Sequence, residues 1–284
     1  MADLGIMQGR LVPPEGGRFQ SFPRERWRDE FRLARSAGLA FIEWIYDEYG
    51  EDCNPLATED GIAELSDLSS KHHIALHSVC ADYFMDCPIV RATESEQRKL
   101  AGKLDWLLDR CAMLGIQRIV LPFVDASAIT SAEDLEYIVQ FMPKRIAAAR
   151  DRSIELHFET SLATAAFAEM LNLFESDVVK ANYDTGNSAS LGFDTREELA
   201  AYGRRIGSVH IKDRVLGGST VPLGTGAANI PLSLRLLHEA GYTGDYVLQI
   251  ARSVSGDEPD WIAENAMRVK AMIDSAARVE GVAS

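Results

Sequence analysis

Short apolar segments alternate with longer amphipathic segments along the whole chain. The apolar segments are rich in the β-branched and aromatic residues that are typical of strands, and they cover residues 4–7, 40–46, 74–80, 118–124, 154–159, 178–184, 206–212 and 246–250. Between them, apolar residues spaced three or four apart predict helices over residues 24–37, 58–71, 94–114, 131–151, 163–176, 195–204, 230–240 and 259–278. Strands and helices that alternate in this way form parallel sheets with right-handed crossovers.

The number of these units favours a closed barrel. Eight strand–helix units in 284 residues suit an α/β protein with a single (β/α)₈ TIM barrel, a fold that typically needs about 250 residues. An open, doubly wound sheet is the alternative, but no glycine-rich fingerprint follows the first strand. The sequence contains no linker, so we predict one domain that covers residues 1–284.

Charge and cysteine content narrow the classes of function. The net charge of −14 disfavours nucleic acid as a partner, because a phosphate backbone needs a basic surface. The four cysteines form no CxxC pair, which is typical of reduced thiols in a cytosolic protein. The N-terminus does not resemble a signal peptide, and no apolar run reaches the roughly 18 residues of a membrane helix. We therefore expect a soluble cytoplasmic protein with no membrane contact.

Polar side chains collect where the predicted strands end, and in a (β/α)₈ barrel the active site lies at the carboxyl ends of the strands. Glu159, Asp184, His210 and Gln249 stand at or near the ends of four successive predicted strands. Together they could hold one divalent cation, and oxygen ligands with one imidazole suit Mn²⁺, Mg²⁺, Co²⁺ or Zn²⁺ without choosing among them. Such a cation would polarise the carbonyl group of a hydroxy-carbonyl compound, and Glu159 beside it would be the natural base.

Other polar side chains at the expected strand ends are candidates for contact with a substrate. Lys212 could bind a phosphate or hydroxyl group, or could pair with a neighbouring acid. His157, two residues before Glu159, could be a second base or a hydrogen-bonded core histidine. The candidate substrate-binding residues are Arg10, Glu43, His77, Asn187 and Lys212.

Several of these residues stand in motifs that resemble a known family. Glu159, the segment Asp184-Thr185-Gly186-Asn187 and the segment His210-Ile211-Lys212-Asp213 resemble the xylose isomerase-like barrels of sugar phosphate isomerases and epimerases. The resemblance extends to residues 221–226 and 241–244 and is strongest to the L-ribulose-5-phosphate 3-epimerase and hexulose-phosphate isomerase branch. It implies a divalent metal on Glu159, Asp184, His210 and position 249, proton transfer at a ketose, and a homodimer or homotetramer.

Gln249 departs from the pattern of that branch. The resemblance implies a glutamate there, which acts as a metal ligand and as a second base, whereas an amide cannot accept a proton at neutral pH. Epimerisation needs two opposed bases, while aldose–ketose isomerisation can use one. With Glu159 and Gln249 as candidate catalytic residues, we expect a metal-dependent isomerase of a small sugar, sugar phosphate or related hydroxy-carbonyl compound that works through an enediolate.

Three alternatives remain open. The chain could be a ketose (phosphate) 3-epimerase despite Gln249, or a non-catalytic sugar-binding barrel. Phosphodiester hydrolysis on DNA, the reaction of the abasic-site endonucleases that share this kind of barrel, is disfavoured by the acidic charge and by a total of six histidines.

Overall fold

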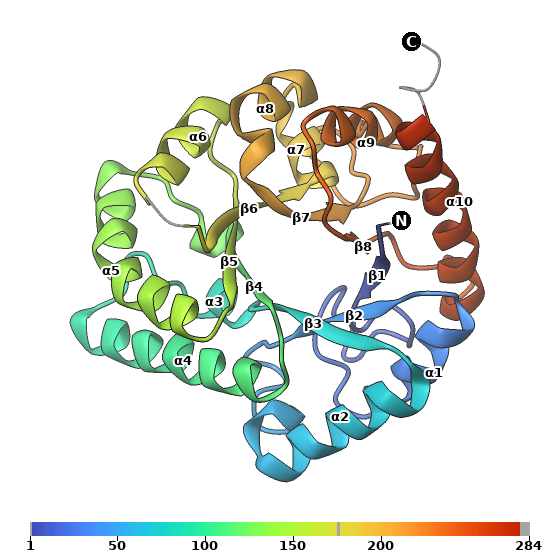
Figure 1. Ribbon diagram of the computed structural model, residues 1–284, viewed down its shortest axis with the longest axis horizontal. Helices are drawn as coiled ribbons and strands as arrows, with labels where there is room; N and C mark the ends of the chain where they lie inside the picture. The colour runs from blue at the N-terminus through green and yellow to red at the C-terminus, as the bar shows by residue number, and fades with distance from the viewer. Residues whose placement is uncertain (1, 175–176, 279–284) are drawn as a thin grey trace.

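A closed barrel of eight parallel strands forms the centre of the protein. The computed structural model describes residues 2–174 and 177–278, and in it each strand pairs with the next one along the chain while β8 pairs with β1 (Figure 1). The strands are β1 (Leu4–Met7), β2 (Phe41–Ile45), β3 (Ala75–Cys80), β4 (Arg118–Phe123), β5 (Glu155–Thr160), β6 (Val179–Asp184), β7 (Ile206–Ile211) and β8 (Tyr246–Leu248). The predicted (β/α)₈ TIM barrel is confirmed, with every strand where the alternation of segments placed it.

Helices surround the barrel on all sides (Figure 1). They are α1 (Asp29–Ser36), α2 (Glu59–His72), α3 (Tyr83–Asp86), α4 (Glu94–Met113), α5 (Ala132–Asp151), α6 (Thr164–Asn172), α7 (Thr185–Leu191), α8 (Thr195–Tyr202), α9 (Ile230–Glu239) and α10 (Glu258–Arg278). Within the described residues, none of them combines the length and the apolar character that crossing a membrane requires.

The predicted helices differ from the observed ones mainly at their ends. The first begins at Asp29, because residues 24–28 form turns in which the amides of Arg26 and Trp27 donate to the carbonyl of Pro23. The helix predicted over 163–176 ends at Asn172, and its expected last residues, 175 and 176, lie outside the described part of the chain. The short helices α3 and α7 were not predicted.

Helix α7 forms because Asp184 caps it. The Oδ1 atom of Asp184 accepts hydrogen bonds from the backbone amides of Gly186 and Asn187, which satisfies two of the free donors at the helix start. Gly192 ends the helix with a φ of 77°, a conformation that glycine adopts without strain. A residue expected to bind metal thus also determines where a helix begins.

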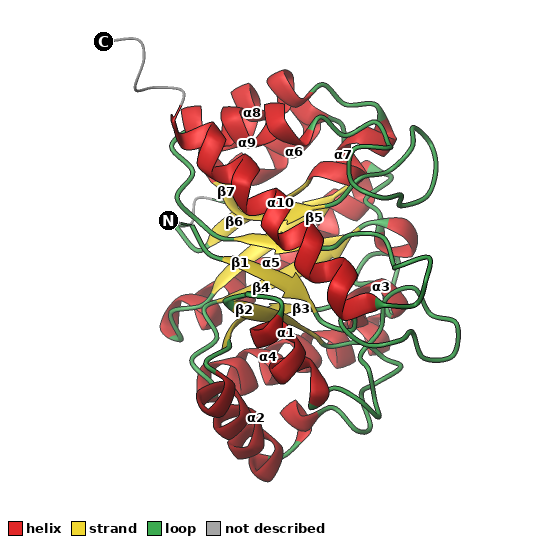
Figure 2. Ribbon diagram, turned by 90° about the vertical axis from the view of Figure 1, so that its right-hand side faces the viewer, coloured by secondary structure: helices red, strands yellow, loops and turns green. Residues whose placement is uncertain are grey.

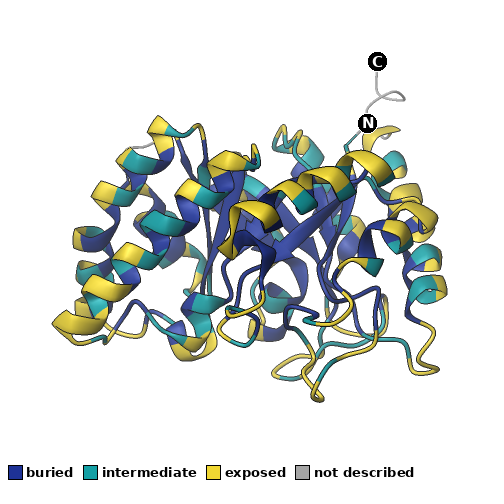
Figure 3. Ribbon diagram, turned by 90° about the horizontal axis from the view of Figure 1, so that it is seen from below, coloured by how far each residue is buried: buried dark blue, intermediate teal, exposed yellow. Residues whose placement is uncertain are grey.

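The core has an apolar outer layer and a partly polar centre. Apolar side chains fill the space between the barrel and the buried faces of the helices, while the exposed residues lie on the outer faces and in the loops (Figure 3). Strand register explains how polar side chains meet inside the barrel, since Asp184 pairs with His210 and Asn182 with Ser208 across β6 and β7. Residues two apart on a strand share a face, so these pairs form successive layers.

The two ends of the barrel differ in their loops. The N-terminus lies at one end, on the left in Figure 2, whereas longer loops and the short helices α3 and α7 lie at the opposite end. This opposite end carries the carboxyl termini of the strands, where barrels of this kind have their active sites.

Candidate metal centre

Three buried side chains converge at the carboxyl end of neighbouring strands. Nδ1 of His210 lies 3.5 Å from Oε2 of Glu159 and 3.9 Å from Oδ2 of Asp184, and the three ligand atoms all lie within 4.8 Å of one another. Such spacings suit ligands of one cation held by bonds of roughly 2.0–2.2 Å. Two carboxylates and an imidazole fit a divalent ion by their chemistry as well as by their positions.

Glu43 determines which nitrogen of His210 faces the other two ligands. Nε2 of His210 lies 2.6 Å from Oε1 of Glu43, and the other carboxylate oxygen of Glu43 accepts the hydroxyl hydrogen of Ser78. In the neutral imidazole, a hydrogen on Nε2 donates to Glu43 and leaves Nδ1 with a lone pair that can accept from the amide of Asn182, 3.2 Å away. A carboxylate behind a histidine is the usual way to orient a metal-binding imidazole.

Charges within the site shift the pKa values of its members. Burial would raise the pKa of Glu43, yet the nearby His210 and Arg118 lower it to about 2. Burial would lower the pKa of His210, but the charges of Glu43, Glu159 and Asp184 raise it above its ordinary value. Burial and the charge of Asp184 raise the pKa of Glu159. A cation bound between these groups would relieve the repulsion between the two carboxylates and displace any proton from the imidazole.

Asn187 and Lys212, two of the residues predicted to bind substrate, border the three candidate ligands. Nδ2 of Asn187 donates to Oε1 of Glu159 at 2.5 Å. The ammonium group of Lys212 lies 2.7 Å from Oδ2 of Asp184 and 3.4 Å from Oδ1 of Asn187. A positive charge therefore already stands beside a carboxylate oxygen that a metal would use.

Gln249 and Arg10, which follow the neighbouring strands β8 and β1, share one hydrogen-bond acceptor. Nε2 of Gln249 and Nη2 of Arg10 donate to the same oxygen, Oε1 of Gln20, at 2.9 Å and 2.8 Å. Within the described residues, Oε1 of Gln249 is buried without a hydrogen-bond partner. Buried polar atoms normally have a partner, so a cation or a substrate hydroxyl would satisfy this oxygen.

Glu43 and His77 occupy other positions than expected. Glu43 is completely buried behind His210, where it is not open to a substrate. Nε2 of His77 pairs at 3.0 Å with Asp245, the residue before β8, at the amino end of the barrel. The expected position of His77 is thus corrected: it is the third residue of β3 and lies at the opposite end from the three ligands.

Sequence reasoning missed two residues that contact the expected site. Nδ2 of Asn182 donates to Oε2 of Glu159 at 3.0 Å, and Gln20 joins Gln249 to Arg10. Asn182 could have been found, because it stands two residues before Asp184 and shares its face of β6. Gln20 lies in the loop before α1, where no periodic pattern marks it.

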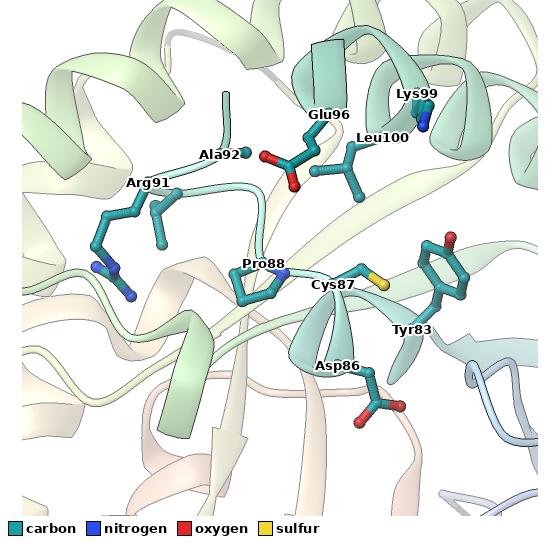
Figure 4. Close-up of a pocket in the computed structure, with 10 residues that line it drawn as sticks. Tyr83, Asp86, Cys87, Pro88, Arg91, Ala92, Glu96, Lys99 and Leu100 are labelled. Carbon is teal, nitrogen blue, oxygen red and sulfur yellow. The ribbon is translucent and has the colours of Figure 1, made fainter. Parts of the chain in front are cut away.

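A separate hollow lies outside the barrel, next to α3 and the start of α4. It has a volume of about 390 Å³, and Tyr83, Cys87, Arg91 and Leu100 are among its lining residues (Figure 4). None of the candidate site residues lines it. The site is therefore identified by its converging ligand atoms rather than by this hollow.

Comparison with known proteins agrees with this geometry. L-ribulose-5-phosphate 3-epimerase UlaE of Escherichia coli O1:K1 / APEC is 23% identical over 276 residues, which cover 90% of this chain and 93% of the relative. A solved structure of L-ribulose 3-epimerase matches with a TM-score of 0.79 and 16% identity over 100% of this chain and 99% of its own. The IOLI protein, solved with a binding zinc atom, matches with a TM-score of 0.73 and 18% identity over 97% and 98%.

These likenesses support an enzyme of the isomerase and epimerase type. The profile of the family described as xylose isomerase-like TIM barrel matches residues 31–272. Since this match spans most of the chain, the protein belongs to the xylose isomerase-like TIM barrel family.

Proposed function

We propose that this protein is a divalent-metal-dependent isomerase of a small sugar, sugar phosphate or related hydroxy-carbonyl compound. The observation that carries the proposal is the convergence of Glu159, Asp184 and His210, whose ligand atoms lie within 4.8 Å of one another. Kinship with proteins named sugar epimerases supports a sugar as substrate.

The residues around the three ligands have distinct roles in this proposal. Glu159, Asp184 and His210 would hold the ion, with the free oxygen of Gln249 as a fourth ligand, and the ion would supply Lewis-acid polarisation of the substrate carbonyl. Glu159 removes the proton from the carbon beside the carbonyl and returns it to the neighbouring carbon on the same face of the enediolate, while the hydroxyl proton moves from one enediolate oxygen to the other. Asn187 and Lys212 bind substrate oxygens, and Glu43 keeps His210 in place.

Gln249 favours isomerisation over epimerisation. A 3-epimerase must return the proton to the opposite face of the same carbon, which requires a second base. The amide of Gln249 cannot fill that role, and Arg10 and Gln20 beside it do not accept protons either. A single base at Glu159 is sufficient for isomerisation.

The proposal is tested by metal analysis and by incubation with sugars in deuterated water. We expect near-stoichiometric divalent metal in the purified protein, interconversion of at least one aldose–ketose pair, and deuterium at the exchanged carbon. A protein that binds Mn²⁺ yet neither converts nor labels any sugar in the panel, phosphorylated members included, would instead be a sugar-binding barrel.

Restoring a carboxylate at position 249 should change the reaction. We expect Gln249→Glu to bind Mn²⁺ more tightly, because the site gains a negative charge, and to produce 3-epimers of the ketose that the wild type releases unepimerised. Product analysis by chromatography measures this, and Gln140→Glu on the exposed face of α5 is the matched control. If Gln249→Glu forms no epimer although it binds metal, position 249 does not face the reacting carbon.

Removing the charge of Lys212 should strengthen metal binding. The ammonium group stands 2.7 Å from a ligand oxygen of Asp184 and repels a divalent cation, so we expect Lys212→Met to lower the Kd for Mn²⁺ about tenfold. Titration of the metal-free protein measures this, with Lys144→Met on the surface of α5 as control. Weaker Mn²⁺ binding in Lys212→Met would show that Lys212 supports the site rather than competing with the ion.

A further inference from the structure

A row of hydrogen bonds runs through the barrel interior from its amino end to Glu159. Oε2 of Glu155, whose side chain is 43% exposed, lies 2.8 Å from Nε2 of His157. Nδ1 of His157 lies 2.7 Å from Oγ of Ser208, and the Ser208 hydroxyl donates to Oδ1 of Asn182 at 2.6 Å. Nδ2 of Asn182 then donates to Glu159 at 3.0 Å. His157, Ser208 and Asn182 are buried, so the row is shielded from water between its ends.

The carboxylate of Glu159 determines the direction of the bonds between it and His157. A carboxylate only accepts, so Asn182 must turn Nδ2 toward Glu159 and Oδ1 toward Ser208. Ser208 gives its one hydroxyl hydrogen to Asn182 and must therefore accept a hydrogen from Nδ1 of His157. With the one hydrogen of a neutral imidazole on Nδ1, Nε2 has none to donate to Glu155, so this 2.8 Å contact carries a hydrogen only when the ring is protonated. Each bond from His157 to Glu159 thus has one direction.

Gly207 independently supports the position of the His157 ring, because the ring occupies the space that a side chain at position 207 would need. A Cβ atom added at Gly207 would lie 2.5 Å from Cε1 and 2.6 Å from Nε2 of the His157 ring, whereas Cβ atoms in proteins essentially never come within 3.0 Å of such neighbours. Any other residue at position 207 would push the imidazole out of its place beside Ser208. The chain therefore has a glycine on β7 where the ring of a β5 residue needs room.

We propose that His157 and Ser208 are positioning residues that fix the carboxylate of Glu159. Asn182 holds Oε2 and Asn187 holds Oε1, so two amides orient the base. Ser208 supports this orientation by donating to Oδ1 of Asn182, because a reversed amide would place an oxygen 3.0 Å from the carboxylate oxygen. The inference rests on the proposed role of Glu159 as the base.

The row orients Glu159 but does not carry protons to it. Proton transfer along the row would require the Asn182 amide to release one hydrogen and take up another on a different atom, which an amide does not readily do. The role of His157 is therefore to fix the Ser208 hydroxyl, and its own protonation is not part of the proposed reaction.

Two replacements of His157 separate positioning from packing. In His157→Asn the amide nitrogen can take the place of Nδ1 and still donate to Ser208, whereas His157→Leu fills the space without a donor. We expect His157→Leu and Ser208→Ala to lower kcat about tenfold, the effect of losing one hydrogen bond, with unchanged KM and Mn²⁺ content. His157→Asn should stay close to the wild type. A pure packing role predicts the reverse order, with leucine better than asparagine, and that order or equal losses in both variants would overturn the proposal.

A second measurement does not depend on turnover. The side-chain amide signals of Asn182 in ¹⁵N-labelled, metal-free protein can be assigned by their loss in Asn182→Ala. We expect them to move in His157→Leu and Ser208→Ala and to keep their positions in His157→Asn. If no sugar is converted but the signals behave in this way, the proposed function fails while the row stands. Unchanged signals and unchanged kcat in His157→Leu and Ser208→Ala would disprove the row.

Discussion

Replacing Glu159 with glutamine is expected to lower kcat by about a thousandfold while the barrel stays folded. A positioned general base typically contributes a factor of about 10²–10⁴ to the rate, and an amide cannot take up the proton. Asn182 and Asn187 both donate to this carboxylate. The amide nitrogen of a glutamine would therefore face the N–H group of one of them, with no hydrogen-bond acceptor between the two donors. The measurement is single-turnover deuterium exchange into the substrate with saturating Mn²⁺.

The matched control for this variant is Glu169→Gln. Glu169 is exposed on α6, so the same chemical change there removes a surface charge without touching the site. Metal content must be measured in both variants, because Glu159 is also a proposed ligand. Exchange at the wild-type rate in a metal-loaded Glu159→Gln would mean that another group removes the proton, and the proposed mechanism would be wrong.

The fold could be predicted because the same strand–helix pattern recurs along the whole sequence. Each strand–helix unit buries one apolar face, so errors at one end of one element do not change the alternation as a whole. The three candidate ligands could be predicted to lie together for a related reason. Glu159, Asp184 and His210 each come at or next to the end of a strand, and parallel neighbours in a closed barrel bring such ends together. The register of Asp184 beside His210 is what that argument requires.

The sequence does not show which residues the other polar side chains contact. Glu43 was expected to meet a substrate, but it pairs with His210, 167 positions away. Gln249 donates a hydrogen bond to Gln20, 229 positions away, in a loop that carries no periodic pattern. Such contacts depend on side-chain orientation inside the closed barrel, and a shift of one residue in a strand changes it.

His77 shows that a small error in the predicted position along a strand can place a residue at the wrong end of the barrel. It lies on the correct strand, but three residues before the end of β3, and this distance along the strand puts it at the other end of the barrel. Helix α7 was missed because its seven residues are too few to show a helical period. Its start depends on the capping carboxylate of Asp184, which sequence reasoning had assigned to the metal.

Replacing His210 with alanine is expected to weaken binding of divalent metal at least about a hundredfold. Replacing a residue that hydrogen-bonds a metal ligand typically lowers metal affinity about 10–100-fold, and His210→Ala removes a proposed ligand itself. Elemental analysis of wild type and variant measures the loss. His72→Ala in the last turn of α2 is the matched control, because it removes a histidine near the surface and leaves the metal content unchanged.

Thermal unfolding separates loss of the ion from loss of the fold. A ligand that binds only the folded state raises its stability, so Mn²⁺ should raise the Tm of the wild type and of His72→Ala but not that of His210→Ala. The metal-free variant should also unfold at a lower temperature, since Glu43 loses the partner of a completely buried charge, a change that typically costs about 3–5 kcal/mol. A wild type that contains no metal and gains no stability from added Mn²⁺ would show that the glutamine at position 249 has abolished the site. The protein would then be a metal-free sugar-binding barrel, and Gln249→Glu should recover metal binding.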